Sequence, residues 1–339
     1  GATLASSSVA GGPRRPSGSV KATRSCATRL DAAPTPVTGG SLVALVTPFA
    51  DASASAVDHG ALRALLEWHL EAGTSGIVAL GTTGEASTLT EDEKAAVLRT
   101  TVDACKGQVP IVVGTGTIDT RATIRATQQA ADLGADASLV VTPYYVKPPQ
   151  KALVNHFEAV ADAVDLPLLL YNVPGRTGVD MLPATVAELA AHERIIGIKE
   201  ATGDVSRVAE LRASCGEDFL LLSGDDATCV DFVIAGGDGV ISVTTNVAPE
   251  RMAEVMDVRR HRDDDAAVAR VRSDDAEYLS GLHNDLFVQA NPIPVKWALS
   301  AAGKIGSSSM RMPLAALEEE YEGRVQAAME KAGVPRSVA

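Results

Sequence analysis

Short apolar runs recur along the chain from residue 41 onward, and longer segments with a helical period separate them. The runs are bounded by Gly, Pro, Thr or Asp and are nearly continuous in apolar character. This pattern is typical of strands that are buried on both faces of a parallel sheet. Eight such runs predict eight strands, at residues 42–46, 76–80, 111–113, 138–141, 166–171, 195–199, 219–222 and 239–243.

The segments between these runs have the start and stop signals of helices. Asp58 precedes one helical pattern, and Thr90 with Glu93 forms a capping box at the start of the next. Gly73 lies where a helix end favours a left-handed residue. Strand–helix units of this kind predict an α/β fold, a (β/α)8 TIM barrel. A doubly wound open sheet is the alternative, but no G-x-G-x-x-G motif follows the first strand.

The two ends of the chain differ in composition from the middle. Residues 1–40 are rich in Ala, Ser, Thr, Gly and Pro with scattered Arg, and have no apolar period, which predicts a disordered leader. Residues 41–262 would form the barrel. Residues 263–339 continue with helical patterns throughout and predict a C-terminal helical extension.

The leader is also the basic part of an acidic protein. Residues 1–40 have a net charge of +4 within a chain of −13, so the remainder has −17. A leader that is rich in Ser and Arg and poor in acids is typical of a transit peptide, which predicts the plastid stroma ahead of the mitochondrion. The alternative is a cytoplasmic protein with a disordered tail. An acidic body does not favour nucleic acid or anionic membranes as partners.

Other classes of function find no support in the sequence. No apolar stretch approaches the roughly 18 residues that span a bilayer, so we expect no membrane segment. The six histidines form no i,i+3 or i,i+4 pair, so we expect no metal site. The G-x-S-x-G and P-loop motifs are absent.

The active site of a TIM barrel forms where the strands end, so reactive side chains at those ends are the candidates. Lys199 ends the sixth apolar run and would emerge from it into the barrel mouth. Desolvation there disfavours the ammonium and favours a nucleophilic amine. The alternative is a structural lysine that pairs with Glu200. Lys296 also follows apolar residues, but it lies beyond the eighth strand in a helix start, so we expect it to be structural.

Hydroxyl and guanidinium groups end other strands. Tyr145 and Tyr171 could pass protons to and from an intermediate, with Thr83 linking them, although packing is the usual role of tyrosine. Residues 81–84 offer backbone N–H groups to a carboxylate, and Arg176 could clamp a second carboxylate or form a surface ion pair. Together the residues predict a lysine Schiff-base lyase or synthase that acts on a small carboxylated carbonyl compound.

From Ser41 to about Gly333 the chain resembles the 4-hydroxy-tetrahydrodipicolinate synthase family. The resemblance rests on a set of motifs spread over the whole body, at residues 45–49, 81–85, 142–145, 171–177, 197–203, 223–226, 239–243 and 291–297. It implies condensation of pyruvate with L-aspartate 4-semialdehyde, the first committed step of lysine (diaminopimelate) biosynthesis, without a cofactor.

The resemblance also implies roles for individual residues. Lys199 would form the imine with pyruvate, Tyr171 would be the acid and base, and Thr83 with Tyr145 would complete a proton relay. Tyr145 would reach the site of a partner subunit in a homotetramer, a dimer of dimers. The substrate-binding residues implied by the resemblance are Thr82, Thr83, Arg176, Gly224 and Ile241.

Sister families are the alternatives to this activity. N-acetylneuraminate lyase and 2-keto-3-deoxy sugar-acid aldolases share the barrel, the lysine and the tyrosine of the fifth strand. They typically lack the double threonine at 82–83 together with Arg176 and the 292–297 segment. A non-enzymatic paralogue would be expected to have lost Lys199 or Tyr171, and both are present.

One departure from the family concerns feedback by lysine. Members that lysine inhibits bind it through Asn and Glu side chains at the dimer interface, and these positions align with Ile118 and Ala122 here. Neither side chain can make those polar contacts. An aromatic or histidine contact aligns with Glu91. The sequence therefore predicts weak or absent feedback by lysine.

Overall fold

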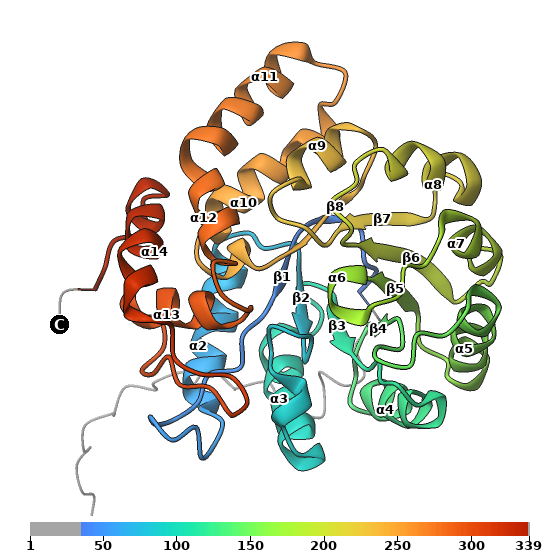
Figure 1. The fold of residues 1–339 in the computed structure, drawn as a ribbon, viewed down its shortest axis with the longest axis horizontal. Helices are drawn as coiled ribbons and strands as arrows, with labels where there is room; N and C mark the ends of the chain where they lie inside the picture. Colours follow the sequence, from blue (N-terminus) through green and yellow to red (C-terminus); the bar gives the residue numbers. More distant parts are fainter. Residues whose placement is uncertain (1–34, 338–339) are drawn as a thin grey trace, which may run out of the picture.

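Eight parallel strands form a closed barrel in the order in which they follow one another along the chain (Figure 1). The computed structural model describes residues 35–337. All eight predicted strands are present, with ends shifted by one or two residues. They are β1 (Gly40–Ala44), β2 (Gly76–Ala79), β3 (Ile111–Gly114), β4 (Ala137–Val141), β5 (Leu168–Asn172), β6 (Ile195–Glu200), β7 (Leu220–Ser223) and β8 (Gly239–Ser242).

Helices connect the strands and cover the outside of the barrel (Figure 1). The predicted caps are confirmed: Asp58 accepts from the Ala61 N–H, and Thr90 forms a capping box with Glu93. The helices of the barrel part are α2 (His59–Glu71), α3 (Glu91–Cys105), α4 (Thr120–Asp132), α5 (Gln150–Ala163), α6 (Pro174–Thr177), α7 (Pro183–Leu189), α8 (Arg207–Cys215), α9 (Cys229–Ile234) and α10 (Pro249–Met256), with short 3-10 turns at Ala86–Thr88, Thr244–Asn246 and Asp257–Arg260.

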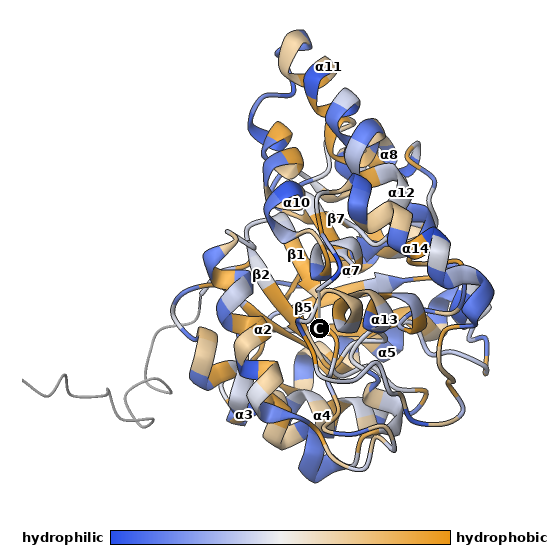
Figure 2. Ribbon diagram, turned by 90° about the vertical axis from the view of Figure 1, so that its left-hand side faces the viewer, coloured by the Kyte–Doolittle hydropathy of each residue, from blue (hydrophilic) through white to orange (hydrophobic). Residues whose placement is uncertain are grey.

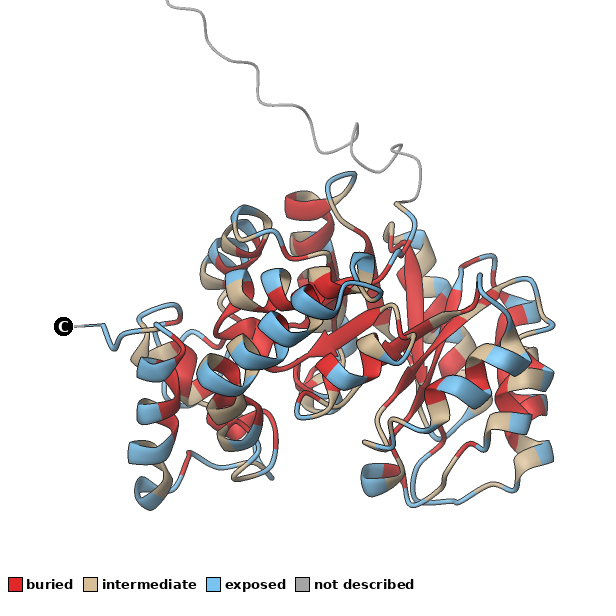
Figure 3. Ribbon diagram, turned by 90° about the horizontal axis from the view of Figure 1, so that it is seen from above, coloured by how far each residue is buried: buried red, intermediate tan, exposed pale blue. Residues whose placement is uncertain are grey.

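The strands are buried on both faces, as their continuous apolar runs predict. Figure 2 shows the strands as the most hydrophobic elements, and Figure 3 shows them buried beneath helices whose outward faces are exposed. One cluster of buried side chains fills the barrel interior, and two larger clusters pack between strands and helices. The interior cluster comes from alternate strand positions, among them Leu42, Ala44, Val78, Val112, Leu139, Leu169, Tyr171, Leu222 and Ile241.

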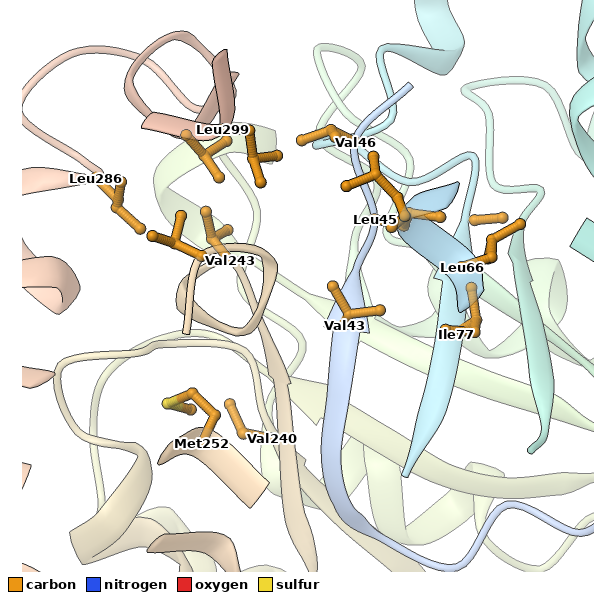
Figure 4. Packing of buried hydrophobic residues seen from close by; sticks show 14 of the residues in the cluster. Val43, Leu45, Val46, Leu66, Ile77, Val240, Val243, Met252, Leu286 and Leu299 are labelled. Atoms are coloured by element: carbon orange, nitrogen blue, oxygen red, sulfur yellow. The ribbon is translucent and has the colours of Figure 1, made fainter. Parts of the chain in front are cut away.

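The C-terminal extension packs onto the same core as the barrel. Its helices are α11 (Asp265–Asp274), continued by a π-helical turn (Asp275–Leu279), then α12 (Ser280–Asp285), α13 (Ile293–Ala301) and α14 (Glu319–Lys331). Figure 4 shows Leu286 and Leu299 beside Val243, which follows β8, and all three belong to one buried cluster. The boundary expected after residue 262 falls in the turn before α11.

Two expectations about the chain ends need correction. The extension is not helical throughout: residues between Ala301 and Glu319 form turns and loop, where Gly303, Gly306 and Pro313 disfavour a helix. The folded body also begins before residue 41, because Val37 is buried and the Thr35 N–H donates to Asp136. The transit-peptide prediction concerns residues 1–40, of which residues 1–34 lie outside the described residues. Within the described part, no helix is long and apolar enough to cross a membrane.

Candidate active site

Lys199 and Tyr171 lie side by side at the carboxyl ends of neighbouring strands. They are register partners between β5 and β6, and Lys199 Nζ lies 4.5 Å from the centroid of the Tyr171 ring. Lys199 is 7% exposed and Tyr171 is 9% exposed. Tyr171 belongs to the cluster of side chains inside the barrel. Lys199 lies two residues from Gly197 and from Ala201, and Ala201 packs against the same cluster. Because strand side chains alternate, both reactive groups face the barrel mouth rather than the helices.

The next register pair, Asn172 and Glu200, faces the opposite side of the sheet. Asn172 Nδ2 donates to Glu200 Oε2 at 3.1 Å, and Arg207 donates to the same carboxylate at 3.5 Å. Burial raises the pKa of Glu200, and hydrogen bonds from Asn172 and Thr202 oppose that effect. Glu200 therefore does not pair with Lys199, which was the structural alternative for the lysine. Among residues 35–337 no carboxylate lies within ion-pair distance of Lys199 Nζ.

Gly224 follows β7 and leaves the room that the Lys199 side chain occupies. A Cβ atom at Gly224 would lie 2.8 Å from Lys199 Cε and 2.7 Å from Ala201 Cβ, closer than real Cβ contacts. Ile241 is fully buried in β8 and belongs to the cluster inside the barrel, as Tyr171 does. The structure thus places both predicted pocket residues around the lysine end of the barrel.

The loop after β2 holds the two predicted threonines in different surroundings. Thr82 is exposed, whereas Thr83 is 3% exposed. The Thr83 hydroxyl oxygen accepts from Asn291 Nδ2 at 2.9 Å. From the other side, the Thr47 hydroxyl donates to the Gly84 carbonyl at 2.7 Å and fixes the loop to the segment after β1. Thr83 is therefore held rigidly, and Thr82 faces solvent.

The rival lysine, Lys296, lies in α13 and is structural, as predicted. Its Nζ donates to Glu85 Oε1 at 2.6 Å, and both side chains are completely buried. Burial lowers the pKa of Lys296, and the Glu85 carboxylate opposes that shift. Glu85 also accepts from the Arg311 backbone N–H. The pair therefore joins the C-terminal extension to the loop that contains the threonines.

Tyr145 and Arg176 lie on exposed loops at the same end of the barrel. Tyr145 is 87% exposed with a positive φ of 70°, and its N–H donates to the Thr177 carbonyl at 3.3 Å. Arg176 is exposed in the short helix α6. A single chain therefore brings Lys199 and Tyr171 together at the buried mouth, buries Thr83 in the loop after β2, and leaves Tyr145 in solvent.

Sequence reasoning missed Asn291 and Thr47 as contributors to the site. Both lie in motifs of the family resemblance, yet nothing in the local sequence shows that they hydrogen-bond to a loop far along the chain. Within the described range, no group of three or more His, Cys, Asp and Glu side chains is placed to hold a metal ion. Chemically, the mouth offers a buried amine, a phenol beside it and an anchored hydroxyl.

A model of the Dihydrodipicolinate synthetase family matches residues 37–332. The chain belongs to this family. A 4-hydroxy-tetrahydrodipicolinate synthase from Alcanivorax borkumensis is 51% identical over 296 residues, which cover 87% of this chain and 98% of that protein. The TIM barrel and the family resemblance expected from the sequence are both confirmed.

Solved structures of dihydrodipicolinate synthases also superpose on the chain. A chloride-inhibited enzyme from Acinetobacter baumannii, complexed with pyruvate, is 45% identical with a TM-score of 0.83 and covers 88% of this chain and 100% of its own. The enzyme from Cyanidioschyzon merolae with lysine bound is 36% identical with a TM-score of 0.83, and the match covers 88% of this chain and 99% of that one.

Proposed function

We propose that the protein is a lyase that condenses pyruvate with L-aspartate 4-semialdehyde to 4-hydroxy-tetrahydrodipicolinate. The observation that carries the proposal is Lys199, a buried lysine at a strand end whose Nζ faces the Tyr171 ring. Membership of the Dihydrodipicolinate synthetase family supports this activity over that of a sugar-acid aldolase. No cofactor enters the reaction, because the lysine amine itself activates the ketone.

The chemistry begins with attack of the Lys199 amine on the keto carbon of pyruvate. The keto oxygen leaves as water, and an imine joins the lysine nitrogen to that carbon. Loss of a methyl proton gives an enamine, whose carbon attacks the aldehyde of the second substrate and forms a hydroxyl group. The amino group of that substrate then attacks the imine carbon, closes the ring and expels Lys199 unchanged.

Tyr171 is the group best placed to move protons in these steps. Its ring packs against Lys199 Nζ, and it belongs to the cluster inside the barrel. We assign Thr82, Thr83 and the backbone around them to the pyruvate carboxylate, and Arg176 to the carboxylate of the second substrate. Gly224 and Ile241 line the lysine side of the pocket.

Borohydride reduction in the presence of pyruvate tests the proposal. Reduction converts the imine to a stable secondary amine, so peptide mass mapping should find the pyruvate adduct on Lys199 and not on Lys296. The assay then compares L-aspartate 4-semialdehyde with N-acetylneuraminate and 2-keto-3-deoxygluconate. Labelling at another lysine would overturn the mechanism, and turnover of a sugar acid in place of the semialdehyde would favour the sister families.

We also propose that Tyr145 acts in the site of a partner subunit within a homotetramer built from dimers. Among the described residues, four exposed large apolar side chains lie on the loops after the neighbouring strands β3 and β4: Ile118, Tyr144, Tyr145 and Val146. Such a patch favours a protein interface. A second copy that covered it would bury Tyr145 and bring its hydroxyl to another mouth.

Mixing two inactive variants tests the exchange of Tyr145. Tyr145→Phe and Lys199→Met subunits, refolded together, would form mixed dimers in which one site has both an intact lysine and the partner's Tyr145. Activity should return to about a quarter of wild type, because random pairing gives one good site in half of the dimers. No recovery despite mixed dimers would place Tyr145 in its own subunit's site, and a monomer in sedimentation would end the proposal.

The surroundings of the lysine-binding positions support weak or absent feedback. Ile118 is 46% exposed, Ala122 lies in the first turn of α4, and Glu91 is paired with Lys94 at 2.8 Å. Ile118 and Ala122 have neither the amide nor the carboxylate expected at their positions, and the Glu91 carboxylate is already paired with Lys94. An inhibition curve should stay flat at micromolar lysine, and half-inhibition in that range would contradict the proposal.

A plastid location is a proposal that rests on the composition of residues 1–40 alone. The Alcanivorax borkumensis relative is a bacterial protein, which gives that location no support and favours the cytoplasmic alternative. Fusion of residues 1–40 to a fluorescent protein in plant or algal cells distinguishes the two, because only a transit peptide would deliver the fusion to plastids.

A further inference from the structure

A connected network of polar side chains lies on the outer face of β5 and β6, behind the register pair of Lys199 and Tyr171. Its members are Asn172, Asp180, Glu200 and Arg207. Asn172 is completely buried, and the side chains of Glu200 and Arg207 are 2% and 16% exposed. The proposed reaction steps use none of them. Because desolvation offsets most of the attraction within such a buried network, stability alone explains its presence poorly.

The Asn172 amide closes the loop that leaves β5. Its Oδ1 accepts from the Met181 N–H at 2.9 Å. Its Nδ2 donates to Asp180 Oδ1 at 2.8 Å and to Glu200 Oε2 at 3.1 Å. A backbone N–H can only donate, so it must meet the amide oxygen, and this contact fixes the orientation of the amide. Residues 173–181 therefore form a loop whose two ends meet at one buried side chain.

Arg207 in α8 holds the returning end of this loop. Its Nη1 donates to Asp180 Oδ1 at 2.9 Å and its Nη2 donates to Asp180 Oδ2, which makes the pair bidentate. The same Nη1 donates to the Met181 carbonyl at 3.4 Å and to Glu200 Oε2 at 3.5 Å. A planar guanidinium with two parallel hydrogen bonds fixes both the distance and the direction of its partner. Asp180 is thus held from β5 and from α8 together.

The loop contains Arg176, and its first residues are attached to the interior of the barrel. Val173 belongs to the same interior cluster as Tyr171, and its carbonyl accepts from the Arg176 N–H at 2.9 Å and from the Thr177 N–H at 3.1 Å. The Thr177 hydroxyl donates to the Val179 carbonyl at 2.9 Å. Helix α6 is only one turn long, so contacts within it do not fix its direction, and the two ends of the loop must do so.

We propose that Asn172, Asp180 and Arg207 are positioning residues that hold Arg176 where it meets the carboxylate of the second substrate. The inference rests on the proposed function, in which Arg176 binds that carboxylate. The network lies on the side of the sheet away from Lys199 and therefore acts through the loop. It should matter for binding of L-aspartate 4-semialdehyde and not for the reaction of pyruvate with the lysine.

Asp180→Ala tests the inference, because it removes the carboxylate that Asn172 and Arg207 both hold. We expect the KM for L-aspartate 4-semialdehyde to rise about tenfold, since a misplaced guanidinium makes a poorer bond to the substrate carboxylate. The KM for pyruvate and the rate of borohydride trapping on Lys199 should stay within about twofold of wild type. Gln150 Nε2 donates to the backbone carbonyl of residue 180 at 2.7 Å, so the loop end stays attached and the variant should fold.

Asp238→Ala is the matched control at the opposite end of the barrel. Asp238 precedes β8 and pairs with Arg212 of the same helix α8 at 2.8 Å, and the side chains of Asp238 and Asp180 are 25% and 32% exposed. Loss of either pair should lower the urea midpoint by a similar amount, but Asp238→Ala should leave both KM values unchanged. Arg207→Lys keeps the test open if Asp180→Ala fails to fold. It retains the charge but cannot make the bidentate pair, and it should raise the KM for the semialdehyde about threefold.

A double-mutant cycle decides whether the network acts through Arg176. In an Arg176→Ala background, Asp180→Ala should raise the KM for the semialdehyde by less than about twofold, because the group that the network places is gone. Independent increases that multiply would overturn the inference. So would an unchanged KM in Asp180→Ala, or a loss of pyruvate trapping as large as the loss of semialdehyde binding. If the wild type neither traps pyruvate on Lys199 nor condenses the semialdehyde, the proposed function itself fails and the inference falls with it.

Discussion

Lys199 and Lys296 are two buried lysines that follow apolar segments, and their surroundings give them opposite roles. Lys296 is completely buried in α13 and bonds to Glu85 at 2.6 Å. Lys199 ends β6 at 7% exposure, beside an aromatic ring and with no carboxylate within ion-pair distance among the described residues. Burial is common to both, so burial alone does not identify a catalytic lysine.

The difference lies in the partner that each side chain meets. A buried ammonium is costly unless an opposite charge compensates it, and Glu85 compensates Lys296. Lys199 has the face of Tyr171 beside it and no carboxylate within ion-pair distance among the described residues, so no ion pair holds its amine away from a carbonyl. A buried lysine without a carboxylate, at a strand end of a barrel, is the combination that indicates covalent catalysis.

The largest expected effect comes from removal of the catalytic amine. Lys199→Met should lower activity by more than about a thousandfold and abolish borohydride trapping of pyruvate, because no imine can form. Lys199→Arg should be as inactive, since the guanidinium stays protonated. The steady-state assay and mass mapping measure both. Lys296→Met is the contrast and should still trap pyruvate. If Lys296→Met lost trapping and Lys199→Met kept it, the assignment of the two lysines would be reversed.

The free energy of unfolding should show the opposite order, with the larger effect in Lys296→Met. Lys296→Met leaves the Glu85 carboxylate buried and unpaired, which should cost about 3–5 kcal/mol in the free energy of unfolding. Lys199→Met removes an unpaired amine, so its stability should equal or exceed that of wild type. Urea unfolding measures both values. The double variant Lys296→Met/Glu85→Gln should recover most of the loss, and no recovery would show that packing rather than charge compensation was lost.

The comparison extends to His69 in α2, a buried histidine that has no carboxylate partner among residues 35–337. Burial, with a smaller effect of Lys304, lowers its pKa from 6.5 to about 3. The pKa of His69 is lower in the folded protein than in the unfolded chain. Its neutral ring therefore makes its full contribution to the free energy of unfolding above pH 6.5, and this contribution is lost as the pH falls toward 3. The loss should reach about 2 kcal/mol at pH 5, at about 1.4 kcal/mol per pH unit.

Unfolding in urea at pH 7 and pH 5 tests the role of His69. Its Nδ1 bonds to Thr74 at 3.0 Å, so His69→Gln retains a polar group while it removes the titration. The wild type should lose about 2 kcal/mol more than this variant between the two pH values. Equal losses would show that His69 is not held neutral in the folded protein.

The fold was predictable because each of its signals is local. Buried parallel strands need continuous apolar runs, and helices need caps such as Asp58 and Thr90, so eight repeats of both signals indicate a barrel. The strand ends then indicate where Lys199 and Tyr171 lie, because side chains alternate along a strand. Register pairs these two residues, and the period of two places Glu200 on the other face.

The contacts that hold the site are long-range, and no local signal indicates them. Asn291 meets Thr83 and Lys296 meets Glu85 across more than 200 residues, through the packing of α13 against the barrel. The sequence identified Lys296 as structural from its position, but its partner depends on where the extension folds back. The start of the folded body was missed for a similar reason, since Val37 is an isolated apolar residue in a polar segment.

Gly224 offers the finest test of what makes Lys199 different, because it changes the space around the amine without changing a charge. Gly224→Ala would put a Cβ 2.8 Å from Lys199 Cε, and Ala201 on the other side at 2.7 Å cannot give way as a flexible chain can. We expect the rate of pyruvate trapping to fall about tenfold and stability to fall by about 1–3 kcal/mol. Gly323→Ala in α14 meets no atom within 4 Å and should instead raise stability by about 0.5–1 kcal/mol with trapping unchanged. If Gly224→Ala trapped pyruvate at the wild-type rate, Lys199 would not need the position seen here. Its reactivity would then depend on the absence of a carboxylate partner rather than on its placement.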